Sequence, residues 1–195
     1  WKNFWQTGTG VTYQAFNISN ADLRGGPSIR YPGYMNYWAY AQTDRRKKFF
    51  IYTFAQLQAG FENFSHFAAI DFDFVYRPVN ALSISISPSV SRNNSHLQYV
   101  HTADVSSVHK RYIVGEINQT TLRTSIRITY MVTPNLSIQY YGQPFGTSGK
   151  YSNYKYVTDG NAPSYEDRFQ TYPASAITDI GDEYQVYEYR YDSIS

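Results

Sequence analysis

The segment from Thr120 to Tyr141 restricts the possible folds of this 195-residue chain more than any other. Its side chains alternate between apolar and polar, with a short break at Thr133-Pro134-Asn135. A β-strand directs successive side chains to opposite faces of a sheet, so each half of the segment has one apolar and one polar face. Proline donates no backbone hydrogen bond and asparagine tolerates turn geometry, so we expect a turn at the break. The segment therefore predicts a long antiparallel hairpin.

The two faces of this hairpin differ in chemistry. The first arm is about ten residues long, which is the length that a tilted strand needs to cross the hydrocarbon layer of a membrane. Two structures fit this alternation: a half-buried strand of a soluble β-sandwich, and a strand of a membrane barrel with lipid on its apolar side and water on the other. The apolar set contains Leu122, Ile126, Ile128, Tyr130, Val132, Leu136, Ile138 and Tyr140, and the polar set contains Arg123 and Arg127.

A second hairpin of the same kind lies earlier in the chain, around a turn at residues 77–80. Phe72 matches Ile126 and Ile84 matches Ile138, so the two copies are offset by 54 residues. A longer and more polar connection, residues 92–116, is expected between them. Short turns at one end of the strands and longer connections at the other end are typical of a barrel that has a periplasmic and an outer side. The apolar set here is Phe72, Phe74, Tyr76, Leu82, Ile84 and Ile86, and the other face carries Asp71, Asp73 and a row of serines.

Further strands are predicted on both sides of these hairpins. A charged turn, Asp44 to Lys48, separates two of them, and Gly8 and Gly10 thin the first strand on one of its faces. The eight to ten strands expected could close a small barrel. The chain lacks a terminal aromatic strand, so we expect a partial barrel that belongs to a larger one. The remaining segments are strands at 1–16, 33–43, 49–61 and 183–191, a polar connection at 17–32 and a long loop at 146–176.

Composition narrows the class of protein. Mean hydropathy is −0.51 and no apolar run approaches 18 residues, so no transmembrane helix is predicted. The low mean hydropathy does not exclude a membrane β-barrel, because the lipid-facing residues of a barrel alternate with polar ones. The 21 Tyr, 12 Phe and 3 Trp suit the aromatic girdles of such a barrel. The chain has no Cys, which excludes disulfides and thiolate metal sites. A formal charge of +2 with scattered basic residues gives nucleic-acid binding little support.

The candidate chemical groups are charges on the polar faces. Asp71 and Asp73 lie two apart on one strand, with about 7 Å between side chains, and paired carboxylates can hydrolyse glycosides. We favour a second role, in which they line an aqueous lumen and are balanced by Arg123 and Arg127. The four histidines, His66, His96, His101 and His109, match no known ligand spacing, so no metal or other cofactor is expected.

Three motifs in order are similar to those of an uncharacterised Bacteroidetes-type family. They are Leu23-Arg24-Gly25-Gly26-Pro27 with Thr43-Asp44-Arg45-Arg46-Lys47, then residues 136–145, then Gly149-Lys150-Tyr151-Ser152-Asn153-Tyr154. The similarity spans most of residues 20–170. It implies an outer-membrane barrel domain in a Gram-negative bacterium, usually behind a β-sandwich similar to family-9 carbohydrate-binding modules. It implies no catalytic residue.

Together these observations predict an all-β chain: residues 1–195 form one region of an antiparallel up-and-down transmembrane barrel. Ile84, Ile86, Ile126 and Ile128 are expected to face lipid, and Asp71, Asp73, Arg123 and Arg127 to face the lumen. The expected role is a pore, an anchor or a scaffold in the outer membrane, with the bilayer as partner, together with a glycan or an associated membrane or periplasmic protein. No enzyme activity is expected. The alternatives are a soluble Tyr-rich sandwich that binds carbohydrate, and a hydrolase using Asp71 and Asp73.

Overall fold

The computed structural model describes residues 3–104, 110–179 and 184–186, and these residues form an all-β structure without an α-helix. Within these described ranges, three single-turn 3-10 helices connect strands. Among the described residues, no helix is long and apolar enough to span a membrane. The strands are β1 (Gln6–Ser19), β2 (Ile29–Gln42), β3 (Phe49–Gly60), β4 (Ser65–Val79), β5 (Leu82–Asp104), β6 (Lys110–Thr133), β7 (Leu136–Gly142), β8 (Phe145–Val157), β9 (Phe169–Thr171), β10 (Ile177–Asp179) and β11 (Tyr184–Val186).

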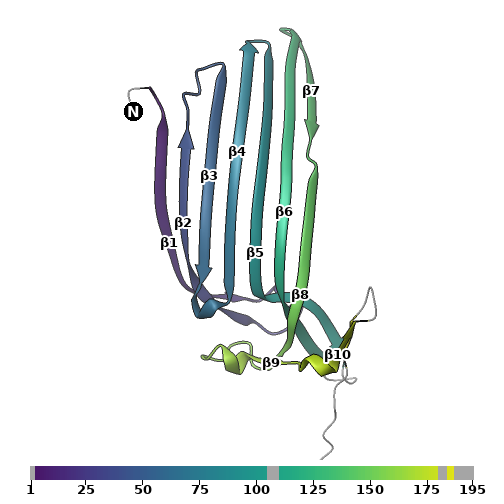
Figure 1. The fold of residues 1–195 in the computed structure, drawn as a ribbon. Helices are drawn as coiled ribbons and strands as arrows, with labels where there is room; N and C mark the ends of the chain where they lie inside the picture. Colours follow the sequence, from purple (N-terminus) through teal and green to yellow (C-terminus); the bar gives the residue numbers. More distant parts are fainter. Residues whose placement is uncertain (1–2, 105–109, 180–183, 187–195) are drawn as a thin grey trace, which may run out of the picture. The chain divides into compact units, whose positions relative to one another are not determined.

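Nine of these strands form one antiparallel up-and-down sheet within the described ranges (Figure 1). The order is β1-β2-β3-β4-β5-β6-β8-β9, and β7 also pairs with β6. Since β7 and β8 are separated only by residues 143–144, they form one interrupted neighbour of β6. The predicted antiparallel all-β class is confirmed. The sheet is open, so closure into a barrel stays a prediction.

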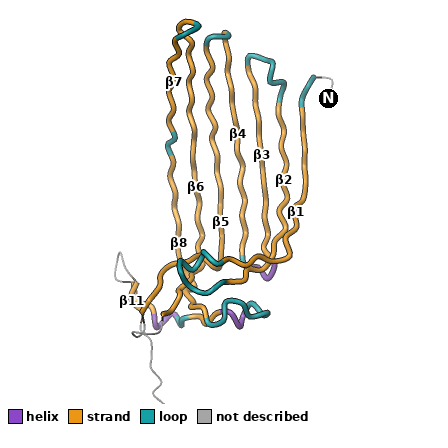
Figure 2. The backbone as a smooth tube through the Cα atoms, turned by 180° about the vertical axis from the view of Figure 1, so that it is seen from behind, coloured by secondary structure: helices purple, strands orange, loops and turns teal. Residues whose placement is uncertain are grey.

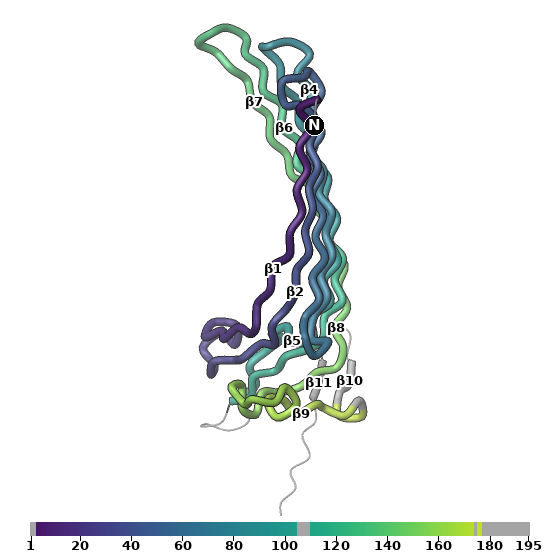
Figure 3. The backbone as a smooth tube through the Cα atoms, turned by 90° about the vertical axis from the view of Figure 1, so that its left-hand side faces the viewer, coloured from purple at the N-terminus to yellow at the C-terminus, as the bar shows by residue number. Residues whose placement is uncertain are grey.

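Contacts divide the chain into two compact units. Unit 1 contains most of the long strands, and it is a single layer: seen edge-on, its strands form one sheet with no other described segment of the unit over either face (Figure 3). Unit 2 contains the β1–β2 connection, the adjoining ends of β5 and β6, and the chain from residue 151 onward. The units are 1–17, 31–95 and 117–150 for unit 1, and 18–30, 96–116 and 151–195 for unit 2.

Both predicted hairpins are present in unit 1. The β4–β5 and β6–β7 connections are short turns at 80–81 and 134–135, which Figure 2 shows at the same end of the sheet. The register shifts by one residue just before each turn, between Tyr76 and Val79 and between Met131 and Thr133. The charged segment Asp44 to Lys48 also connects two strands, as predicted. The 54-residue repeat therefore corresponds to two hairpins of the same design.

A predicted connection, 92–116, and part of a predicted loop, 146–176, are strand instead, and the turn expected at Ser106-Ser107 lies outside the described residues. Most of the segment 92–116 is strand, because β5 continues to Asp104 and β6 begins at Lys110. The segment 146–176 contains most of β8, whose residues pair with β6 and β9. In both segments polar side chains occupy both faces, so the alternation that reveals a half-buried strand is absent, while backbone pairing still forms. Of the predicted final strand, residues 184–186 are extended, and Tyr187, Tyr189 and Tyr191 lie outside the described residues.

Unit 2 has a small core of its own. Ile113, Tyr154 and Tyr172 pack together, with Tyr156 partly buried against them. Arg168 is 2% exposed, and its guanidinium donates to three backbone carbonyls: Nε to Ala162 at 2.7 Å, Nη1 to Arg30 at 2.9 Å and Nη2 to Pro163 at 2.7 Å. A buried charge needs such partners. Arg168 therefore holds segments distant in sequence together within this unit.

Candidate functional site

Strand pairing in unit 1 decides which side chains share a face of the sheet. Residues directly opposite each other on neighbouring strands point to the same side. Leu57 of β3 lies opposite both Tyr37 of β2 and Ala68 of β4, and Ala68 lies opposite Arg92 of β5. Every second residue along these strands belongs to the same face, which we call the apolar face. The intervening residues form the polar face.

An ion pair extends this assignment to β6. Nη2 of Arg123 lies 3.5 Å from Oδ1 of Asp71, so these two residues share the polar face. Ile126 and Ile128 are in the opposite phase of β6 and therefore belong to the apolar face. On β5, Ile84 and Ile86 lie opposite Tyr76 and Phe74 and belong to it as well. The four isoleucines predicted to face lipid thus share one face.

Many large side chains on the apolar face are exposed, and others are half-buried. Ile86 is 44% exposed, and Ile84, Ile126 and Ile128 are half-buried, so none of the four is sealed in a core. Folded monomers rarely leave a contiguous apolar surface of this extent open to water. Lipid contact itself stays a prediction. Other exposed members of the apolar face are Val11, Met35, Tyr37, Phe49, Leu57, Ile70, Tyr76, Val90, Leu122, Tyr130, Ile138 and Tyr140.

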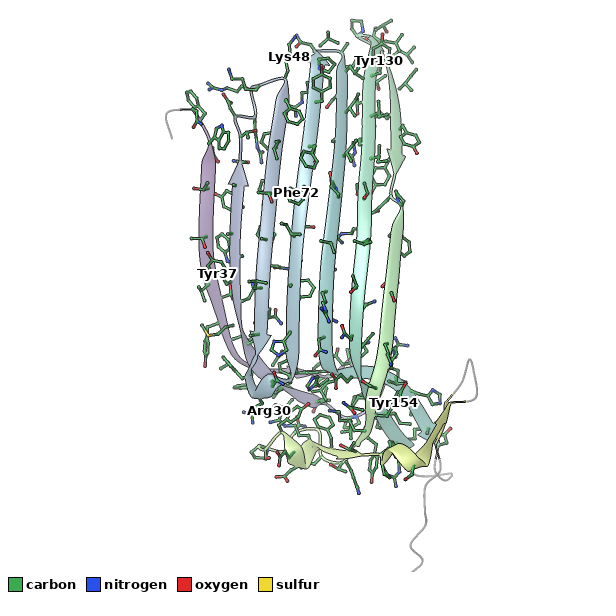
Figure 4. The ribbon with its side chains drawn as sticks, viewed as in Figure 1. Arg30, Tyr37, Lys48, Phe72, Tyr130 and Tyr154 are labelled. Atoms are coloured by element: carbon green, nitrogen blue, oxygen red, sulfur yellow. The ribbon has the colours of Figure 1, made fainter. Side chains whose placement is uncertain are left out.

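The apolar face has the length of a membrane span. From Phe49 to Ala59 along β3 it extends about 34 Å at about 3.4 Å per residue. A strand tilted by about 40° would then rise about 26 Å, close to the apolar band of about 25 Å in outer-membrane barrels. Tyr130 lies near one end of β6, at the end of the sheet where Lys48 of the β2–β3 turn also lies, and Phe72 lies closer to the middle of the sheet (Figure 4). Aromatic residues at such ends suit membrane–water boundaries.

The polar face is organised around the serines of β5. Ser89 lies opposite Asp71, and Asp71 on β4 reaches Arg123 on β6, with β5 between the two strands. A serine side chain is small enough for the two charged groups to meet above it. Ser87 Oγ donates a hydrogen bond to Oδ1 of Asp73 at 2.9 Å. The sequence predicted that Arg123 and Arg127 balance these aspartates across a lumen, and that balance stays a prediction. The pattern gave no sign that Arg123 reaches Asp71 over the serines of β5.

Aromatic rings lie on other parts of the polar face, beside polar residues such as Gln56 and Gln58. The guanidinium of Arg127 lies 5.3 Å from the ring centroid of Tyr141, its opposite residue on β7. Trp38 and Tyr40 stack with centroids 6.4 Å apart, and Tyr40 and Tyr52 stack at 6.1 Å. The face therefore offers charges, hydroxyls and amphipathic rings, which are the groups that line aqueous channels.

The structure adds no support for hydrolysis or a metal centre. Asp71 and Asp73 each contact a partner of their own, Arg123 and Ser87, on an open face. A nitrogen of His66 lies 2.6 Å from Oδ1 of Asn63. Across residues 3–104, 110–179 and 184–186, no three His, Asp or Glu side chains gather as a metal ion requires. In unit 2, His96 lies 3.5 Å from Glu116, and His109 lies outside the described residues.

The fold and its two faces define an all-β protein built on an open antiparallel sheet with one apolar and one polar surface. The chain belongs to the family described as a domain of unknown function, DUF5916, whose model matches residues 1–177. No curated protein and no solved structure matches the chain significantly. The predicted membership of an uncharacterised family is confirmed. The barrel type and the preceding carbohydrate-binding-like domain stay predictions.

Proposed function

We propose that the sheet of unit 1 forms part of the wall of a β-barrel in the outer membrane of a Gram-negative bacterium. The apolar face contacts lipid, and the polar face lines an aqueous lumen. The observation that carries this proposal is a contiguous apolar face, long enough to span a bilayer, that no described segment of unit 1 covers. The charged face behind it supplies the second surface that a barrel wall needs.

The proposal requires more strands than the open sheet contains. Unpaired N–H and C=O groups along the free edges of β1 and β7 would be costly in hydrocarbon, since no water is there to bind them. A barrel removes such edges by pairing them. The closing strands come from the same polypeptide or from another copy of it. The sheet described here is one sector of the wall.

The polar face favours passage of polar solutes over simple anchoring. Asp71, Asp73, Arg123 and Arg127 give it charges of both signs, and Ser87 and Ser89 add hydroxyl groups. Such side chains hold water and influence which solutes pass. A pore for polar solutes is therefore the role we propose. The family resemblance adds the proposal that this pore serves a surface or periplasmic glycan-handling partner.

A site-directed spin-label scan of β6 tests the proposal. The chain has no native Cys, so Ile126→Cys, Arg127→Cys and Ile128→Cys each create a single labelling site. In lipid vesicles, labels at 126 and 128 should collide with oxygen dissolved in the hydrocarbon, and the label at 127 with a water-soluble nickel complex. A soluble sandwich would instead shield both isoleucine positions from both reagents, because a second sheet would cover them, and that result would refute the membrane assignment.

A further inference from the structure

Arg92 is a cation on the apolar face. Along β5 it follows Val90 by two residues, and it lies opposite Ala68 of β4. Its Nε donates to Oδ1 of Asn118 at 3.4 Å, which is a neutral partner. Within the described part of the chain, no carboxylate forms an ion pair with Arg92. A guanidinium beside hydrocarbon is costly unless it finds an anion or reaches the headgroup region.

Two adjoining hollows on the apolar face meet at Arg92. Their volumes are about 510 Å³ and 360 Å³, and Leu57, Ala68 and Arg92 line both. Ala59 lines the first hollow and Ala55 the second, so short side chains leave space among longer neighbours. The result is an apolar groove beside a positive charge. The first hollow also includes the polar residues His66 and Asn94, and the second includes Ile70 and Val90.

We propose that this groove binds an acidic phospholipid of the surrounding membrane. The phosphate contacts the guanidinium of Arg92, and an acyl chain lies over the alanines toward Ile70 and Val90. Guanidinium binds phosphate through parallel hydrogen bonds, and the bilayer supplies phosphate beside acyl chains. The polar residues on one side of Arg92 and the apolar residues on the other match the two parts of such a lipid. This inference rests on the proposed membrane function.

Lipid retention by the intact chain tests the site. The protein is incorporated into phosphatidylcholine vesicles that contain phosphatidylglycerol and is then solubilised in mild detergent. Native mass spectrometry measures the phosphatidylglycerol that stays bound. We expect retention by the wild type, a loss of about fivefold in Arg92→Gln, and substantial retention in Arg92→Lys, because the positive charge is kept. Arg127→Gln is the matched control, since it removes one arginine charge from the polar face.

The experiment distinguishes a failure of the lipid site from a failure of the membrane proposal. Insertion is measured first, by flotation of the protein with the vesicles. If the protein inserts and Arg92→Gln retains as much phosphatidylglycerol as the wild type, the lipid site is refuted and the membrane proposal stands. If the protein does not float with vesicles, the membrane proposal fails and the lipid site fails with it. Equal losses in Arg92→Gln and Arg127→Gln would show a general charge effect and would also refute the site.

Discussion

Two glycines on β1 make room for aromatic rings on β2. A side-chain carbon at Gly8 would overlap the ring of Tyr40, and one at Gly10 would overlap the ring of Trp38. The rings therefore lie close over the glycine backbone on the polar face, an arrangement known to stabilise glycine in a sheet. The sequence predicted a thinned strand at these two positions, and the structure shows which side chains use the space.

We predict that Gly8→Ala and Gly10→Ala each lower the free energy of unfolding by about 1–3 kcal/mol, because an added methyl group forces the ring out of its place. Gly146→Ala is the control, since no atom lies close to a side-chain carbon built there, and its effect should stay within about 0.5 kcal/mol. Urea unfolding of the three variants measures the difference. Similar stabilities for all three would contradict the proposed contact.

The turn between β2 and β3 is held by a carboxylate. Both side-chain oxygens of Asp44 accept hydrogen bonds from the Arg46 guanidinium, at 2.9 Å each, and the Arg46 backbone N–H donates to Oδ1 at 3.0 Å. The side-chain hydrogen bond, followed by the backbone one, lowers the pKa of Asp44 from 3.8 to about 2. The ionised carboxylate therefore stabilises the folded turn above the unfolded pKa, and this contribution is lost as the pH falls toward 2.

We predict that Asp44→Asn lowers the unfolding midpoint at about pH 5 and has progressively less effect as the pH approaches about 2. At low pH, protonation removes the negative charge of Asp44 from the wild type. The substitution removes the same charge from the variant at every pH, so the two proteins become alike as the pH falls. Thermal unfolding of both proteins across this pH range measures the gap between them. A gap that is independent of pH would show that the charge on Asp44 does not stabilise the turn.

At the scale of elements, β5 lies between β4 and β6 and carries small serine side chains on the polar face. Its serines let Asp71 of β4 and Arg123 of β6 approach to 3.5 Å across the polar face. The Arg123 side chain is 58% exposed and that of Asp71 33% exposed, so water screens the pair. An exposed pair of this kind contributes little to stability and more to the positioning of charge.

We predict a coupling free energy of about 0.2–1 kcal/mol between Asp71 and Arg123, decreasing as salt is added. A double-mutant cycle with Asp71→Ala, Arg123→Ala and the double variant measures it through unfolding in urea. Replacing Ser89 by Leu should abolish the coupling, because a large side chain would separate the two groups. Coupling that survives in the Ser89→Leu background would contradict the role of the serine strand.

The sequence predicts a strand where the two faces of that strand differ in polarity, and it fails where both faces are polar. In β4–β5 and β6–β7 one face is apolar, so period-two alternation predicted both hairpins and the phase of Asp71 and Ile128. From Arg92 to His96 both phases are polar, and the continuation of β5 was predicted as a connection. The site at Arg92 was missed for the same reason. The contacts of Arg168 with distant carbonyls leave no pattern in the sequence at all.

For the molecule as a whole, the central question is what covers the apolar face. In unit 1 the long strands form a single layer (Figure 3). On its apolar face, large side chains such as those of Val11, Leu57 and Tyr140 are exposed. The hydrophobic effect alone would drive this face against other apolar matter in water. Lipid and a second protein layer both satisfy that requirement, but they respond differently to a charge on the face.

Ile86→Arg and Ser87→Arg introduce the same charge at neighbouring positions of β5, whose side chains lie on opposite faces of the sheet. In a bilayer, arginine at 86 would meet hydrocarbon. Through Phe74, Ile86 aligns with Ile51, two residues inside the Phe49 end of the apolar face, so the loss of stability should be smaller than the value of about 2–4 kcal/mol for an arginine at the midplane of a membrane barrel. Arginine at 87 would lie beside Asp73, which already accepts a hydrogen bond from Ser87 at 2.9 Å. We therefore predict that Ile86→Arg reduces the fraction of protein inserted in vesicles, measured by flotation, while Ser87→Arg inserts like the wild type. Equal insertion of both variants would mean that position 86 does not contact lipid, because hydrocarbon would discriminate between the two faces and water would not.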